Sequence, residues 1–68
     1  MKRLEVEYDD GQMGTELIEL IEKRYDEATK KENGTVIWDD PSAELAGKIV
    51  HEFIDGDGLI LKIILEEV

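Results

Sequence analysis

Residues 31–38 read Lys31-Glu32-Asn33-Gly34-Thr35-Val36-Ile37-Trp38, and the two halves of this stretch predict different structures. Asn33-Gly34 favours the end of a helix, because the residue after a helix C-terminus often adopts a positive φ that Gly or Asn accepts at little cost. The β-branched and aromatic residues that follow favour a strand. The sequence therefore predicts a helix that ends before Gly34 and a strand over Thr35–Trp38.

The residues before this stretch predict a strand and a long helix. Residues 3–8 alternate, with Leu4, Val6 and Tyr8 on one side and charged residues on the other, as in a strand with one face in water. Thr15 offers an N-cap for a helix that begins there. The apolar stripe of this helix is Leu17, Ile18, Leu20, Ile21, Tyr25 and Ala28. Its outer surface carries the pairs Glu19/Lys23, Asp26/Lys30 and Glu27/Lys31.

The residues after it predict a second helix and a last strand. Asp40 suits an N-cap and Pro41 the first helical position. Ala46, Ile49, Val50 and Phe53 then follow a helical period. Gly47 lowers helix stability by about 1 kcal/mol relative to alanine, which suggests a close approach to the sheet or the first helix. Residues 59–68 alternate between two faces, with Leu59, Leu61, Ile63 and Leu65 on one and Ile60, Lys62, Ile64 and Glu66 on the other.

Together these elements predict a single domain over residues 1–68 with the order β-α-β-α-β. The charged face of the first strand places both helices on the other face, which gives an α/β two-layer sandwich. Right-handed crossovers then favour a three- to four-stranded, mainly parallel sheet with strands in chain order. One alternative is a hairpin around residues 54–58, which adds an antiparallel fourth strand.

Composition excludes several classes of protein. The 68 residues include 18 acidic and 8 basic side chains, for a formal charge of −10, and no cysteine. The acidic surface repels nucleic acid and anionic membranes, because binding to either needs clustered Lys and Arg. The chain lacks an apolar run that could span a bilayer or act as a signal peptide, so we expect a soluble, cytoplasmic protein.

Several short motifs carry a likeness to a known family. A glycine-containing loop at Gly11 precedes the first helix, and Asp39-Asp40-Pro41 opens the second. His51-Glu52 and Asp57-Gly58 follow, before a final apolar strand. In these features the chain resembles the TusA/SirA-type sulfur-carrier proteins, whose initiation-factor-3-like fold runs β-α-β-α-β-β. That family carries a Cys-Pro-x-Pro motif at its first helix. Here Gly14, Thr15 and Leu17 stand in the places of its cysteine and two prolines.

The missing cysteine decides what the resemblance implies about activity. A sulfur carrier of this family holds a persulfide on that cysteine, and neither Thr15 nor Met13 can form one. The sequence therefore predicts a non-enzymatic, stable, acidic domain without a cofactor. Its origin is either a natural relative that has lost the cysteine or a de novo design on such a backbone. The alternative is a small acidic binding protein that uses its open sheet face or an aspartate-rich edge.

Four aspartates form that edge in the predicted parallel sheet. Asp9 and Asp10 follow the first strand, and Asp39 and Asp40 follow the second. The ends of neighbouring parallel strands lie side by side, and carboxylate clusters there suit Mg²⁺ or Ca²⁺. The competing interpretation is that each aspartate is a cap or turn residue. The catalytic and cofactor-binding sets are predicted to be empty.

Three further features bear on function. The loop Gly11–Thr15 sits where an anion can bind a helix N-terminus, but nearby carboxylates oppose this and a plain turn explains it. Residues 55–66 resemble a calcium loop but have Ile60 where glycine is required. His51 lacks a nucleophile or a second metal ligand, which favours a structural role.

Dimerisation is the last prediction. Ile60, Ile64 and Ile37 would form an apolar strip on the sheet face opposite the helices. This strip, or the free edge of the last strand, could pair two copies in a homodimer. The alternative is a monomer with a partly apolar surface.

Overall fold

A second strand before Gly34 changes the element order from the predicted one to β-α-β-β-α-β. The computed structural model describes all residues 1–68. Its elements are β1 (Lys2–Tyr8), α1 (Gln12–Arg24), β2 (Lys30–Glu32), β3 (Thr35–Asp39), α2 (Ala43–Asp55) and β4 (Ile60–Glu67).

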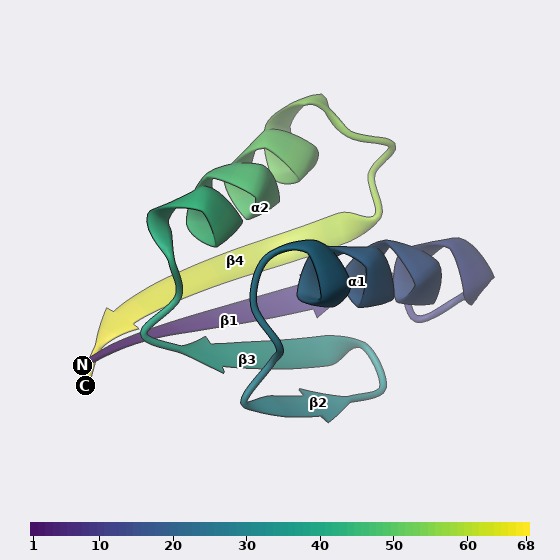
Figure 1. Cartoon of the computed structure of the whole chain (residues 1–68). Coiled ribbons are helices and arrows are strands. Elements are labelled where there is room, and N and C mark those ends of the chain that lie inside the picture. The colour runs from purple at the N-terminus through teal and green to yellow at the C-terminus, as the bar shows by residue number, and fades with distance from the viewer.

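The sheet has the strand order β2-β3-β1-β4, and each neighbouring pair is antiparallel (Figure 1). The predicted mainly parallel sheet with strands in chain order is therefore wrong. The connectivity is that of the ferredoxin-like, split β-α-β arrangement, in which a hairpin strand is inserted between the two strands that the first helix joins. It also differs from the β-α-β-α-β-β order that the sulfur-carrier resemblance implies.

The turn at Asn33-Gly34 is the cause of this difference. It closes a hairpin between β2 and β3, with Glu32 opposite Thr35 and Gly34 at a φ of 85°. Asn-Gly is a signal for a tight hairpin as well as for a helix end. Acid–base pairs at helical spacing over residues 26–31 favour a continued helix, but α1 ends at Arg24. Lys31 instead lies on β2 and binds Glu22.

The core lies between one face of the sheet and the two helices, which both cover that face (Figure 1). The predicted alternation of residues 3–8 is confirmed, because Leu4, Val6 and Tyr8 are buried while their neighbours are not. The remaining buried apolar side chains are Ile18, Ile21, Val36, Trp38, Leu45, Ile49 and Ile60.

An irregularity in β4 changes which of its residues face the core. Glu7 pairs with Lys62 and Tyr8 pairs with Ile60, so Leu61 is an extra residue in the ladder. Such a bulge reverses the alternation of the strand before it. Ile60 is therefore buried in the core, and the prediction that it lies on the open face with Ile64 is wrong. Ile64 does lie on the open face, opposite Glu5.

The loop after α1 is tied to the ends of β3 and α2. The Trp38 indole donates to the backbone carbonyl of Asp26 over 2.9 Å, and the Asp26 carboxylate accepts the Ser42 backbone N–H over 2.9 Å. Ser42 is the N-cap of α2, since its hydroxyl accepts the Leu45 N–H. The predicted N-cap, Asp40, precedes the helix instead, with a φ of 50°.

The start of α1 also differs from the prediction. The helix begins at Gln12 with Gly11 as N-cap, four residues before the predicted cap at Thr15. This early start places Gly14 against Asp9, the residue that follows β1. A Cβ atom at position 14 would collide with the Asp9 backbone carbonyl. Gly47 has the opposite surroundings, with nothing within 4 Å of the place of a Cβ. The predicted close approach at Gly47 is therefore wrong, and the close approach occurs at Gly14.

We expect alanine to have opposite effects at these two glycines. Gly14→Ala should lower the free energy of unfolding by about 2 kcal/mol or more, because the backbone must move to admit the methyl group. Gly47→Ala should raise it by about 1 kcal/mol, because alanine favours an exposed helical site. Urea unfolding followed by circular dichroism measures both. Equal midpoints for Gly14→Ala and the parent would contradict the close approach.

Candidate functional site

The four aspartates predicted to form a cation site lie at two opposite ends of the sheet. Asp9 and Asp10 follow the end of β1, whereas Asp39 pairs with Arg3 near the beginning of β1. The antiparallel direction of β3 causes this separation, since it carries the end of β3 back to the start of β1. The predicted gathering of the four carboxylates does not occur.

Each end uses its aspartates in local contacts. The Asp9 carboxylate accepts the Gly11 N–H over 3.0 Å, and the Asp40 carboxylate accepts the Lys2 N–H over 2.9 Å. The Asp39 carboxylate lies 3.4 Å from Arg3 Nε. The structure contains no group of three or more His, Asp or Glu side chains placed to hold a metal ion. These contacts fit the interpretation of the aspartates as cap and turn residues.

The loop Gly11–Thr15 has its polar groups engaged within the chain. The Gly11 N–H, which would point at an anion, is bonded to the Asp9 carboxylate. The Thr15 hydroxyl donates to the Asp10 carbonyl over 3.2 Å. A negatively charged side chain therefore already occupies this helix N-terminus, where an anionic ligand would meet repulsion.

His51 and the loop after α2 form no reactive set. His51 Nδ1 lies 3.5 Å from the Asp55 carboxylate, and both side chains are mostly exposed. Residues 56–59 connect α2 to β4, and Gly58 turns the chain with a φ of 77°. Glu66, the last position of the apparent calcium loop, pairs with Arg3 far along β4.

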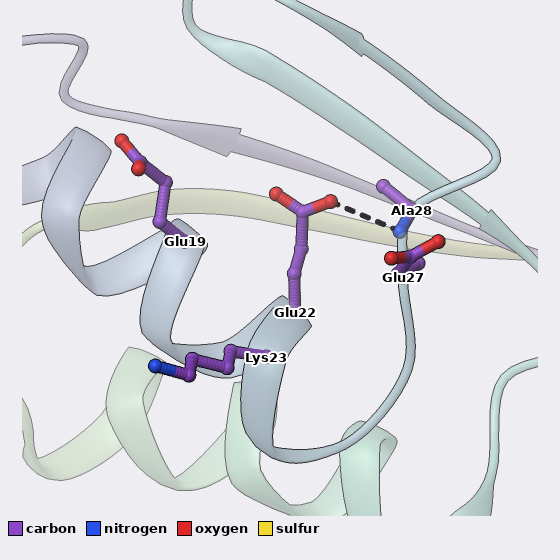
Figure 2. A pocket seen from close by; sticks show the side chains of 5 residues that line it. All are labelled: Glu19, Glu22, Lys23, Glu27 and Ala28. Carbon is purple, nitrogen blue, oxygen red and sulfur yellow. Dashed lines mark hydrogen bonds between the residues drawn. The ribbon is translucent and has the colours of Figure 1, made fainter.

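A hollow of about 360 Å³ lies beside the end of α1, lined by Glu19, Glu22, Lys23, Glu27 and Ala28 (Figure 2). Figure 2 shows Glu22 reaching from the helix to the following loop, where it accepts the Ala28 N–H over 3.1 Å. Its other oxygen lies 2.7 Å from Lys31 Nζ. Glu22 thus connects α1 to the following loop and to β2. Its carboxylate, which lines the hollow, therefore has a structural role.

The hydrogen bond that Lys31 donates to the Glu22 carboxylate raises the pKa of Lys31 above its ordinary value, although burial works against it. An ion pair of this kind stabilises the fold below the ordinary lysine pKa and is lost as the pH rises through the raised value. We expect Glu22→Gln to move the Lys31 pKa down toward its ordinary value, which an NMR titration of the Lys31 side chain measures.

Comparing Glu22→Gln with Glu22→Ala separates the contributions of the Glu22 charge and of its hydrogen bond to the free energy of unfolding. Glu22→Gln keeps an oxygen for the Ala28 N–H, whereas Glu22→Ala leaves that N–H without its partner. We therefore expect Glu22→Ala to lower the free energy of unfolding by about 1 kcal/mol more than Glu22→Gln. Equal losses would show that the Ala28 hydrogen bond contributes nothing.

The open face of the sheet is polar apart from two isoleucines. Ile37 and Ile64 are half-buried and lie on either side of Glu5, which pairs with both. Ion pairs surround them, including Lys62 with Glu7 at 3.9 Å and Arg3 with Asp39. With Ile60 in the core, the predicted apolar strip is divided by a glutamate rather than continuous.

The two edges of the sheet differ sharply in length and chemistry. β2 has three residues, all charged and exposed, and such short, lysine-bearing edges resist pairing with other strands. β4 has eight residues at the opposite edge and reads Ile60-Leu61-Lys62-Ile63-Ile64-Leu65-Glu66-Glu67. Leu61 and Leu65 are 59% and 57% exposed. The apolar edge is therefore β4, and no element covers its outer side (Figure 1).

Helix α2, which packs along β4, adds exposed apolar side chains beside this edge: Val50, Phe53 and Ile54. Their direction follows from helix geometry. On α1, Glu22 comes one residue after buried Ile21 and faces β2. α2 runs in the opposite direction to α1 (Figure 1), so the residues one and four positions after its buried Ile49, which are turned in the same sense around the helix, face the opposite side, toward β4's free edge. These residues are Val50 and Phe53.

We call this surface the β4–α2 surface and define it by Val50, Phe53, Ile54, Leu61, Ile63 and Leu65. Sequence reasoning predicted the free edge of the last strand but assigned Leu61, Val50 and Phe53 to the core. The width of the apolar stripe on α2 indicates that some of its apolar side chains stay exposed, because the stripe is wider than the face that one helix can bury.

The comparisons with known proteins supply no relative. No protein-family model matches the chain, no curated protein matches its sequence, and no solved structure matches its fold. Neither helix has the length and apolar character needed to cross a membrane. The surfaces of the molecule are therefore the features that bear on its function.

Proposed function

We propose that this chain is a non-catalytic binding domain that takes up an extended segment of a protein along the free edge of β4. In this mode, called strand addition, the added segment forms main-chain hydrogen bonds with the edge, and its alternate side chains contact the neighbouring apolar surface. The single observation that carries the proposal is the contrast between the charged, three-residue edge at β2 and the apolar, eight-residue edge at β4.

The hydrogen-bonding groups of β4 support it. Val68 and Met1 exchange backbone hydrogen bonds, which begins the alternation of bonded and non-bonded pairs along β1 and β4. From this start, Ile64 and Lys62 direct their N–H and C=O groups toward β1. Ile63, Leu65 and Glu67 direct theirs outward, so the edge offers a row of free donors and acceptors to an added strand.

The surroundings of this row are suited to a protein segment. On the helix side, Leu65 and Phe53 are exposed and apolar, so alternate side chains of an added strand would meet an apolar surface. On the open side, Lys62 and Glu66 offer charges of both signs. An extended segment with apolar residues at alternate positions matches this arrangement.

Two irregular features favour a binding domain over a design on an idealised backbone. Asp40 adopts a positive φ without being glycine, and β4 contains an extra residue at Leu61. Idealised backbones avoid unintended positive φ angles outside glycine. Bulges in natural sheets often lie at edges, where they direct a side chain or limit pairing.

The proposal is tested by selecting short random peptides displayed on phage against the protein and mapping the selected peptides by amide chemical shifts. We expect peptides with alternating apolar residues, and shifts concentrated at Ile63, Leu65 and Glu67. Leu65→Lys should abolish their binding, because it places a charge on the apolar side of the edge.

The matched control is Leu20→Lys. Leu20 is 53% exposed on α1, so the substitution makes the same chemical change at similar exposure, away from β4. Binding should survive in this variant. Peptides that shift amides on the charged edge at β2, or that bind both variants equally, would contradict the proposal.

A further inference from the structure

We infer that the segment bound at the β4 edge is β4 of a second copy of this chain, which forms a twofold-symmetric dimer with a continuous eight-stranded sheet. This inference rests on the proposed function and names its partner. The evidence is the sequence of β4, which complements itself when two copies run antiparallel.

Symmetry restricts the ways in which β4 can pair with itself. In a twofold-symmetric antiparallel pair, one residue lies on the axis opposite its own copy, and facing residues lie on the same side of the sheet. Placing the axis near the middle of the strand leaves two arrangements, with either Ile63 or Ile64 on the axis. Both satisfy the outward N–H and C=O groups of Ile63 and Leu65.

Charge selects the arrangement with Ile64 on the axis. It sets Lys62 opposite Glu66 of the other copy twice, once on each side of the two isoleucines. Opposite charges in directly facing positions stabilise a strand pair. With Ile63 on the axis, Lys62 would face Ile64 and both charges would lack a partner across the interface. The favoured arrangement also places Lys62 and Glu66 in non-hydrogen-bonded pairs, where facing side chains lie closest.

The helix side of the same arrangement is apolar. Ile63 faces Leu65 of the other copy, and the exposed flank of α2 lies beside the junction in both copies. A standard interface buries about 800 Å² per partner, which is roughly a sixth of the 4472 Å² surface of one copy. The β4–α2 surface provides apolar side chains on two adjacent elements toward this area.

The formal charge of −10 on each copy opposes association. At about 0.15 M salt the screening length is about 8 Å, so charges far from the interface contribute little repulsion. The Lys62–Glu66 pairs lie at the interface itself, where screening is weakest. The dimer should therefore respond strongly to these two charges and weakly to distant ones.

The test is a charge reversal followed by sedimentation velocity from micromolar to millimolar concentration. The parent protein should form a dimer as the concentration rises. K62E and E66K should each weaken the dimer by about tenfold, because two attractive pairs become two repulsive ones. The double variant K62E/E66K should restore the parent affinity, since it rebuilds both pairs with reversed signs.

The control makes the same changes on the other edge. Lys30 and Lys62 have side chains that are 64% and 61% exposed, and each forms a weak ion pair, with Glu32 and Glu7 respectively. K30E and E32K alter net charge as K62E and E66K do, and should leave the dimer unchanged. Equal weakening by both sets, or no rescue in the double variant, would overturn the inferred pairing.

A disulfide test fixes the arrangement. The chain has no cysteine, so a single introduced thiol reports on one contact. I64C should form a disulfide-linked dimer on mild oxidation, because position 64 meets its own copy on the axis. I63C should not. The reverse result would overturn the arrangement with Ile64 on the axis.

The outcomes separate this inference from the proposed function. A chain that stays monomeric at millimolar concentration, yet binds selected peptides at Ile63 and Leu65, refutes the dimer and keeps strand addition. A monomer that selects no such peptide refutes both. A dimer that is insensitive to Lys62 and Glu66 and protects amides elsewhere refutes the inferred pairing, and the peptide selection then decides strand addition by itself.

Discussion

Gly34 turns the chain with a φ of 85°, in the left-handed region that strains residues with a side chain, and the strands on either side of it pair antiparallel. This turn has consequences well beyond the hairpin. It brings β3 next to β1 in the opposite direction, with Glu5 facing Ile37. β1 then has a free side, which β4 fills. The separation of the aspartates and the position of β4 at an edge both follow from that order.

The two edge strands of this sheet, β2 and β4, carry different classes of residue. β2 consists of Lys30, Lys31 and Glu32, whose charges resist pairing with another chain. β4 carries leucines and isoleucines past the area that the helices cover, and α2 places Phe53 and Val50 beside it. An uncovered apolar edge costs solubility, so its presence at the edge opposite a protected one supports the proposed binding surface.

Local patterns predicted some elements well because their signals depend on near neighbours. The alternation in β1, the second helix and the strand over Thr35–Trp38 are all present, although α2 buries Leu45 and Ile49 and leaves Val50 and Phe53 exposed. The wrong predictions share one cause: each rests on a local sequence motif that is compatible with two different structures. Asn33-Gly34 suits a helix end and a hairpin, and Lys31 lies four residues after Glu27 but reaches Glu22 from a strand. Similarly, the alternation of residues 59–68 gave no sign that Leu61 is an extra residue.

The sequence by itself determined the classes of residue available for function: an excess of carboxylates, no thiol and a single histidine. These are properties of side chains and do not depend on how the chain folds. Only the tertiary structure decided which of them meet. It sent Asp9 and Asp39 to opposite ends of the sheet and buried Ile60 while it exposed Leu65. Such outcomes depend on strand direction and register, which arise from contacts between residues far apart in the chain.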